Sequence, residues 1–230
     1  MKKIGLVGGT GPESTAMYYK ELNSIIDAAT DGRNMPEVVI DSVNFRKAWE
    51  MVSAKQHKEL AEYLSEKVNN LIKCGAEIVA LTAATMHIVF DEIVNKTKVS
   101  LVSIPKSICG EVVERGYKKV GLLGTIFTME QDFMKKDLSQ AGIEVIVPDK
   151  AHRDLIAKRI YEELEVGIVK ESTLQEFNAI IKKMRDVYGI EAVVLGCTEL
   201  PLLLNDENCV LPCLDSVEIH IKKLVELAME

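Results

Sequence analysis

Short runs of apolar residues alternate with segments of helical periodicity along the whole chain. In one helical segment, for example, apolar side chains recur at Leu60, Leu64, Val68 and Leu71, which places them on one face of a helix. The runs between these segments are continuously apolar, which is typical of parallel strands covered by helices on both faces. We therefore predict an α/β protein. The expected strands are Ile4–Val7, Val38–Val43, Ile78–Leu81, Leu101–Ile104, Val120–Leu123, Val145–Val147 and Ala192–Leu195.

Two pairs of segments recur at nearly the same separation. KKIGLVGGT, residues 2–10, resembles KKVGLLGT, residues 118–125, at an offset of 116. GAEIVALTAAT, residues 75–85, resembles GIEAVVLGCTE, residues 189–199, at an offset of 114. The repeat predicts two pseudosymmetric three-layer α/β halves with mainly parallel sheets. We expect the first half to comprise residues 1–100 and about 206–230, and the second half residues 101–205.

The ends of the repeated strands are the expected place for function. Ligands of open α/β sheets bind beyond the carboxyl ends of the strands. In the first half these ends are Gly8–Thr10 and Thr82–Thr85, and in the second half they are Gly124–Thr125 and Gly196–Glu199. We expect the active site in a cleft between the halves. In the repeat, Ala83 aligns with Cys197.

Cys197 is the strongest candidate for a reactive group. It directly follows a strand and a glycine, and the polar residues Thr198 and Glu199 come next. A thiol at a helix N-terminus has a lowered pKa and can act as a nucleophile or a base. Cysteine is commonly a buried small hydrophobic residue, and that interpretation fits Cys74 and Cys109. For Cys197 we favour a functional role.

The glycine-rich turn GGTGPEST, residues 8–15, resembles a phosphate-binding loop only superficially. Its glycines do not match G-x-G-x-x-G, and no G-K-[ST] follows. Pro12 suits the first turn of a helix, so a tight strand-to-helix turn is the plainer interpretation. Backbone amides at a helix start also bind carboxylates, which makes Gly9 and Thr10 candidates for a small-anion pocket.

Several threonines could either cap helices or bind a substrate. Thr85 could cap the following helix, and its hydroxyl could also donate to a substrate carboxylate. Thr128 and Gln131 have capping-box spacing, as do Ser172 and Gln175, so we expect Thr128 to be structural. Thr125, at a strand end, is then the better ligand candidate. His87 is expected to be structural.

Two charged residues are further candidates. Arg46 follows the second strand and could clamp a carboxylate through two hydrogen bonds, although most arginines lie on the surface. Glu165 lies at the end of a helical segment, where surface charge is the commoner role.

Composition excludes several classes of protein. The net charge of -7 argues against broad nucleic-acid binding, which depends on clustered Lys and Arg. The odd number of cysteines, five, does not suggest a disulfide framework. Cys209 and Cys213 have loose metal-ligand spacing, but no second pair of Cys or His residues completes a metal site. No apolar run is long enough for a membrane helix, and the N-terminal run is too short for a signal peptide. We expect a cytoplasmic protein.

Four segments together resemble the aspartate/glutamate racemase family, closest to its amino-acid racemase branch. They are MKKIGLVGGTGPEST, TAATMH, GTIFTMEQDF and GCTEL, in the same order and over nearly the whole chain. The resemblance implies a cofactor-independent isomerase and a homodimer. It implies that two cysteines flank the α-carbon of an amino acid and that threonine hydroxyls and backbone amides hold its carboxylates. The substrate-binding candidates are Gly9, Thr10, Arg46, Thr82, Ala84, Thr125, Glu165, Thr198 and Glu199.

This chain departs from the family pattern at two positions. The first site of the family commonly reads Cys-Asn-Thr, whereas this chain has Ala83, Ala84 and Thr85. Alanine cannot transfer a proton. Many relatives place a lysine where this chain has Glu165. A glutamate there would repel the side-chain carboxylate of aspartate, so we expect a substrate with a neutral or cationic side chain.

Three functions remain open. The first is a racemase in which Cys197 works on one face of the α-carbon and Thr82, Thr85 or a water works on the other. The second is a one-base decarboxylase or isomerase, since the arylmalonate decarboxylases of the same superfamily keep only the second-half thiol. The third is a catalytically impaired homologue that binds an amino acid or another small carboxylate without converting it.

Overall fold

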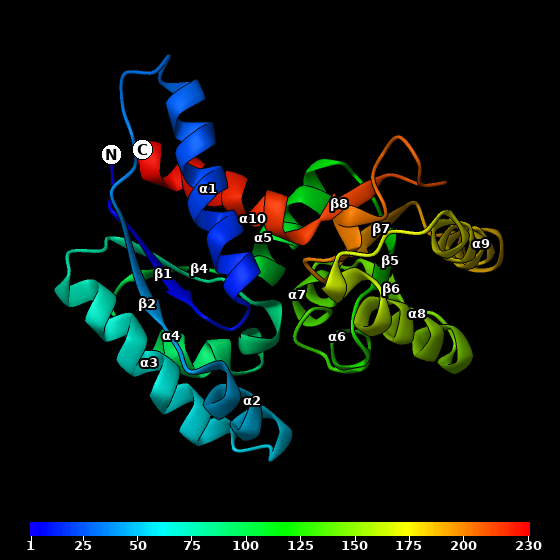
Figure 1. Ribbon diagram of the computed structural model, residues 1–230, viewed down its shortest axis with the longest axis horizontal. Helices are drawn as coiled ribbons and strands as arrows, with labels where there is room; N and C mark the ends of the chain where they lie inside the picture. The colour runs from blue at the N-terminus through cyan, green and yellow to red at the C-terminus, as the bar shows by residue number, and fades with distance from the viewer. The chain divides into compact units, whose positions relative to one another are not determined.

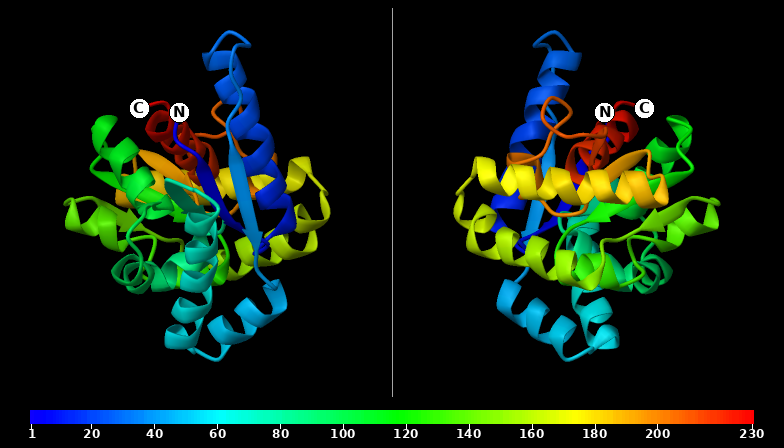
Figure 2. Two further views of the ribbon diagram at one scale, coloured as in Figure 1. Left: turned by 90° about the vertical axis from the view of Figure 1, so that its left-hand side faces the viewer. Right: turned by 90° about the vertical axis from the view of Figure 1, so that its right-hand side faces the viewer.

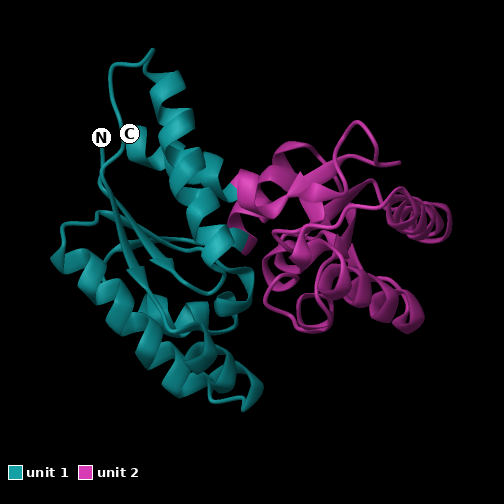
Figure 3. Ribbon diagram, viewed as in Figure 1, with its two compact units in different colours: residues 1–104, 220–230 teal, residues 105–219 magenta.

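The computed structural model describes all residues from 1 to 230 and divides into two compact units (Figure 3). Unit 1 comprises residues 1–104 and 220–230, and unit 2 comprises residues 105–219. Residues 206–219, which the sequence analysis places in the first half, fall in unit 2 in this division.

Unit 1 contains a four-stranded parallel sheet in the order β2-β1-β3-β4. Helices α1 and α10 lie on one face of this sheet and α3 lies on the other (Figure 1). The strands are β1 (Ile4–Gly8), β2 (Val38–Ser42), β3 (Ile78–Leu81) and β4 (Ser100–Val102). The helices are α1 (Pro12–Ala29), α2 (Phe45–Ser53), α3 (His57–Lys73), the 3-10 helix η1 (Ala84–Val89), α4 (Phe90–Lys96) and α10 (Ser216–Met229), whose first residues belong to unit 2.

Unit 2 repeats this topology with a parallel sheet in the order β6-β5-β7-β8. The prediction of two α/β halves with parallel sheets is therefore confirmed. The strands are β5 (Lys119–Leu123), β6 (Glu144–Ile146), β7 (Ala192–Leu195) and β8 (Cys213–Asp215). The helices are α5 (Ile104–Glu114), α6 (Ile126–Glu130), α7 (Lys136–Gln140), α8 (Lys150–Glu162), η2 (Leu164–Val166), α9 (Glu171–Tyr188) and η3 (Leu200–Leu202).

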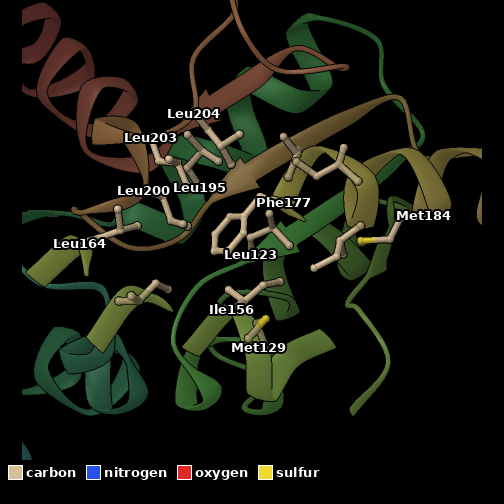
Figure 4. Packing of buried hydrophobic residues seen from close by; sticks show 14 of the residues in the cluster. Leu123, Met129, Ile156, Leu164, Phe177, Met184, Leu195, Leu200, Leu203 and Leu204 are labelled. Carbon is tan, nitrogen blue, oxygen red and sulfur yellow. The ribbon is translucent and has the colours of Figure 1, made fainter. Parts of the chain in front are cut away.

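The core of unit 2 packs α8 and α9 against one face of its sheet. Figure 4 shows Phe177 and Met184 of α9 and Ile156 of α8 gathered with Leu123 of β5 and Leu195 of β7, and all five side chains are buried. Large side chains that interdigitate in this way hold the strands, and therefore their carboxyl ends, at fixed positions. The right-hand view of Figure 2 shows α9 as a long straight helix, in yellow to orange.

The internal repeat extends to the packing of single residues. Gly5 of β1 faces Leu71 of α3, and a β-carbon on Gly5 would lie 2.9 Å from Ala76 Cβ. Gly121 of β5 is the equivalent residue by the offset of 116, and a β-carbon there would lie 2.9 Å from Ile190 Cδ1. Because neither glycine has a β-carbon, the neighbouring side chains can pack closely against the sheet at both positions.

None of the helices combines the length and the apolar character that crossing a bilayer requires.

Two buried histidines of unit 1 are held in their neutral forms. His220 Nε2 donates to Val102 O at 3.1 Å, so its Nδ1 accepts from the hydroxyl of Tyr18 at 2.6 Å. His87 Nε2 accepts from the backbone N–H of Ile104 at 3.1 Å, which leaves its Nδ1 as a donor. Burial lowers the pKa of His87 to about 4 and the pKa of His220 to about 3.

These histidines predict a loss of stability in acid. Their folded-state pKa values lie below the unfolded value of 6.5, so the unfolded chain alone gains protons as the pH falls from 6.5 towards 4. Each histidine should then remove about 1.4 kcal/mol of unfolding free energy per pH unit. Urea titrations from pH 7 to 4.5 check this. The free energy of unfolding should depend less steeply on pH in His220→Gln than in the unaltered protein, whatever the stability of the variant at pH 7. His57→Gln, at an exposed position, is the control and should keep the slope of the unaltered protein. Equal slopes for all three proteins would contradict the assignment.

Candidate functional site

Unit 2 places a thiol, a hydroxyl and a carboxylate together directly beyond β7. The thiol of half-buried Cys197 donates to Glu199 Oε2 at 2.6 Å. The hydroxyl of Thr198 donates to Glu199 Oε1 at 2.7 Å. Gly196 precedes them, and a β-carbon there would lie 2.8 Å from Thr128 Cγ2, so only glycine fits between β7 and α6. Three consecutive residues therefore form one hydrogen-bonded group at the end of a strand.

The environment of Cys197 keeps its thiol protonated. Burial raises its pKa well above the usual value, and the negative charges of Glu199 and Glu165 add to the effect. The sequence-based expectation of a lowered pKa is wrong for this structure. An α-helix with its positive N-terminal end does not follow Cys197; the segment that follows is the three-residue 3-10 helix η3. A carboxylate lies directly against the thiol instead.

Glu165 lies in η2, which follows α8, and is exposed as a whole residue. Partial burial of its carboxyl group raises its pKa, and the negative charge of Glu199 raises it further. The two carboxylates and Cys197 therefore share one strongly negative part of unit 2. A cationic group of a ligand would be attracted there.

The segment that carries Glu165 is fixed by a residue that sequence reasoning missed. Glu163 is 3% exposed, and its carboxylate accepts from Thr173 Oγ1 at 2.6 Å, Arg159 Nη1 at 2.8 Å and Lys170 Nζ at 3.1 Å. Its backbone carbonyl accepts from the N–H of Ile168 at 2.8 Å. Three glutamates stand close together in IYEELEVG, and nothing in that pattern distinguishes the buried one.

Neutralising Glu199 should make the Cys197 thiol more acidic. Because the negative charge of Glu199 raises the pKa of Cys197, Glu199→Gln should lower that pKa and increase the thiolate fraction at a given pH. The pH dependence of Cys197 alkylation by iodoacetamide, followed by peptide mass spectrometry, checks this. Glu162→Gln, on the exposed surface of α8, is the matched control. An unchanged alkylation profile for Glu199→Gln would show that the two groups are not coupled.

The carboxyl end of β1 in unit 1 forms a tight turn into α1. Gly9 has a φ of 85°, and its N–H donates to Thr15 Oγ1 at 2.9 Å. A β-carbon on Gly9 would collide with Ser42 Oγ and Val43 O. Helix α1 begins at Pro12, as predicted, and its N-cap residue Gly11 provides no side-chain cap. The Thr15 side chain thus occupies the amide of Gly9, whereas no side chain caps the start of α1 itself, next to half-buried Thr10.

The carboxyl end of β3 lies beside that of β1, because the two strands are neighbours in the sheet. The Thr82 side chain is buried, and its hydroxyl is already engaged, donating to Val7 O at 3.2 Å and lying 3.3 Å from Thr15 Oγ1. Ala83, Ala84 and Thr85 are half-buried.

The helix that follows β3 is not capped in the way the sequence suggests. Ala83 is the N-cap residue of η1, which has no side-chain cap, so the expected capping role of Thr85 is wrong. Its hydroxyl therefore does not satisfy the start of this helix. His87 Nδ1 instead lies 3.2 Å from both Ala83 O and Ala84 O and ties the turn to the core, a structural role as expected.

The remaining binding candidates are Thr125, which caps a helix, and Arg46, which is exposed. Thr125, rather than Thr128, is the capping residue of α6, because its Oγ1 accepts from the backbone N–H of Thr128 at 3.2 Å. Thr128 is structural in another way, since its buried side chain packs under Gly124 and Gly196. Arg46 is exposed in the first turn of α2, which follows β2. The structure thus gathers Cys197, Thr198, Glu199 and Glu165 in unit 2, and Gly9, Thr10 and Thr82–Thr85 in unit 1.

Comparison with known proteins identifies the family. Residues 7–224 match the family described as Asp/Glu/Hydantoin racemase. The chain is 24% identical over 230 residues to the broad specificity amino-acid racemase RacX of Bacillus subtilis (strain 168), covering 96% of each chain.

Two solved structures agree over the full length of both chains. A candidate Asp/Glu racemase from Yersinia pestis has a TM-score of 0.95 at 33% identity, with 100% of each chain covered. An aspartate racemase homologue from Pyrococcus horikoshii OT3 has a TM-score of 0.92 at 39% identity, also with 100% of each chain covered. The chain therefore belongs to the Asp/Glu/hydantoin racemase family.

Proposed function

We propose that this protein is a cofactor-independent amino-acid racemase or epimerase that transfers protons at the α-carbon, with Cys197 as one acid/base. The observation that carries the proposal is the hydrogen bond of 2.6 Å between Cys197 Sγ and Glu199 Oε2 at the end of β7. The repeat aligns Cys197 with Ala83 at the end of β3, so the first thiol of a two-thiol site is replaced by a methyl group.

Substrate binding would switch Cys197 from acid to base. The negative charges near the thiol favour its protonated form. An amino acid brings an ammonium group, which would offset these charges and lower the pKa of Cys197. Glu199 already accepts the hydrogen bond from the thiol and can take its proton, and the thiolate then removes the α-proton.

The developing enolate needs donors around the substrate carboxylate. The uncapped start of α1 at Thr10 and Gly11 supports this role, since backbone amides at a helix start stabilise anions. The amide of Gly9 already donates to Thr15, so Gly9 would contribute by shaping the turn. Thr85 is the better donor of the two threonines at the end of β3, because the hydroxyl of Thr82 is already engaged. Arg46, Ala84, Thr125 and Thr198 complete the proposed binding residues.

Proton transfer on the far face of the α-carbon would pass through Thr85 or a water that Thr82 and Thr85 hold. A neutral hydroxyl is a weak base, so one direction of racemisation is much slower than the other. A specific observation favours a second candidate, a one-base decarboxylase or isomerase of the same superfamily. The protonated thiol of Cys197 is the form that delivers a proton to a planar intermediate from one face.

The side chain of the substrate should be neutral or cationic, because Glu165 and Glu199 make this region negative. Glu165→Lys should therefore raise kcat/KM for aspartate relative to that for lysine by about tenfold or more, equivalent to about 1.4 kcal/mol. Chiral chromatography with both substrates measures the ratio, and Glu162→Lys is the control for a charge reversal on the exposed surface of α8. Efficient aspartate turnover by the unaltered protein would contradict this substrate preference.

One experiment separates the proposed functions. The protein is incubated with a panel of L- and D-amino acids in heavy water, and α-proton exchange is followed by NMR together with the enantiomer ratio. Exchange with inversion supports the racemase. Exchange with retention indicates a single working base. Binding without exchange would overturn both enzymatic proposals in favour of a homologue that only binds an amino acid.

A further inference from the structure

A stripe of polar side chains on α3 contacts the segment that carries Arg46. The stripe consists of Tyr63, Lys67 and Asn70, which are half-buried and lie on one face of α3 at spacings of four and three residues. The segment comprises residues 41–47 and runs from the end of β2 into the first turn of α2. In Figure 1, α2 continues from the end of β2 and lies beside α3. The carboxylate-binding role proposed above for Arg46 makes no use of the stripe.

Two residues of the stripe hold the strand side of this segment. Lys67 Nζ donates to Asp41 Oδ1 at 2.7 Å, and Asn70 Nδ2 donates to Asp41 Oδ2 at 3.0 Å. The side chains of Lys67 and Asp41 are 18% and 22% exposed, so solvent screens this ion pair less than a pair on the open surface. Because Asp41 is part of β2, these contacts fix the carboxyl end of the strand against α3.

Tyr63 holds the helix side of the segment through contacts before and after Arg46. Its hydroxyl oxygen accepts from the backbone N–H of Asn44 at 2.9 Å. The ammonium group of Lys47 lies 4.4 Å from the centroid of the Tyr63 ring, within the range of a cation–π contact. Asn44 is the N-cap residue of α2, and its Oδ1 accepts from the N–H of Lys47 at 3.3 Å. Tyr63 thus contacts the residue two before Arg46 and the residue directly after it.

The same segment lies against the turn between β1 and α1, whose amides are proposed above to stabilise the substrate carboxylate. The backbone N–H of Val43 donates to Gly8 O at 2.9 Å. A β-carbon on Gly9 would lie 2.6 Å from Val43 O and 2.9 Å from Val43 N, so the two backbones pass each other closely. Arg46 follows three residues after Val43, in the first turn of α2. It therefore extends from a backbone that is held both by α3 and by the turn after β1.

We propose that Tyr63 is a positioning residue for Arg46, and that its hydroxyl and its ring hold residues 44–47 in the conformation in which Arg46 binds the carboxylate of the substrate. The inference rests on the binding role proposed for Arg46. A guanidinium binds a carboxylate through two parallel hydrogen bonds, which makes the contact sensitive to small displacements. Because Arg46 is exposed, the placement of its guanidinium depends largely on the backbone of this turn. Tyr63 acts on that backbone through Asn44 and Lys47 and is not a catalytic residue.

The test measures the dissociation constant of L-lysine by isothermal titration calorimetry on the full chain, with Cys197→Ser as the background so that binding is measured without turnover. Tyr63→Phe keeps the ring beneath Lys47 and removes only the hydroxyl, so the variant should remain folded. It should weaken the binding of L-lysine about fivefold, equivalent to about 1 kcal/mol, which is the usual contribution of one hydrogen bond. Tyr19→Phe, at an exposed position of α1 in the same unit, is the matched control and should leave the dissociation constant unchanged.

A double-mutant cycle separates positioning from a general structural role. Arg46→Ala should weaken binding about tenfold or more. Adding Tyr63→Phe to Arg46→Ala should have no further effect, because no guanidinium is left to position. A fivefold loss that persists without Arg46, or unchanged binding in Tyr63→Phe while Arg46→Ala weakens it, would overturn the inference about Tyr63 alone. A background protein that does not bind L-lysine, or unchanged binding in Arg46→Ala, would instead overturn the proposed binding role of Arg46 and the inference with it.

Discussion

Cys197→Ser should lower the rate of α-proton exchange in heavy water by about a thousandfold, within the range for loss of a general acid/base. A serine hydroxyl ionises far less readily than a thiol, so it can neither remove the α-proton nor return it at a useful rate. The measurement is the initial rate of exchange by NMR on the best substrate of the panel. Cys109→Ser is the matched control, because the thiol of Cys109 lies on α5 and contacts Asp137 O instead of Glu199.

The interpretation depends on the variant remaining folded. Serine is nearly isosteric with cysteine and can keep the hydrogen bond to Glu199, so the melting temperature should change little. Exchange by folded Cys197→Ser at the wild-type rate would remove Cys197 from the mechanism. A loss of exchange in Cys109→Ser of the same size would show that the effect is not specific.

Ala83→Cys should increase the rate of inversion about a hundredfold relative to the unaltered protein, since it restores an ionisable group at the position equivalent to Cys197. Exchange with retention should change much less, because Cys197 alone supports it. The measurement compares the formation of the opposite enantiomer with α-proton exchange in one sample. The ratio of the two rates reports whether protons now reach both faces of the α-carbon.

Ala84→Cys provides the matched control for that gain. It introduces the same thiol one residue along η1, out of register with Cys197 in the repeat. If the rate of inversion rises equally in both variants, the gain does not depend on placing the thiol at position 83. Inversion unchanged in Ala83→Cys would mean that the missing first thiol does not limit the reaction.

The fold could be predicted largely from the sequence because its strands are short, buried and apolar. Such strands alternate along the chain with amphipathic helices, and this alternation predicts a parallel sheet with helices on both faces. The strand β8 was missed since it contains only the three residues Cys213–Asp215 and ends in an aspartate, which is too short a run to give a strand pattern. The capping boxes at Thr128 and Ser172 were wrong, because Thr125 caps α6 and Lys170 precedes α9. Capping motifs specify a helix start only to within a few residues.

The position of Cys197 at the end of a strand could be predicted from the sequence, whereas the surroundings of its thiol could not. Cys197 stands out because a cysteine between a buried strand and two polar residues has no packing role that the pattern explains. The direction of its pKa shift could not be predicted. That shift depends on burial and on a side-chain contact with Glu199, two residues along the chain, whereas the sequence suggested a helix terminus. Glu163 illustrates the same limit, since only tertiary structure distinguishes it from its acidic neighbours.

A crystal structure with a bound amino acid tests most directly whether Cys197 acts at the α-carbon. The measured quantities are the distance from Cys197 Sγ to the α-carbon and the identity of the residue on the opposite face. We predict a distance of about 3.5 Å, as reacting atoms require, with Ala83 on the far side and Thr85 within hydrogen-bonding reach of the substrate carboxylate. An amino acid bound with its α-carbon out of reach of Cys197, or with Cys197 turned away from the bound molecule, would contradict the account.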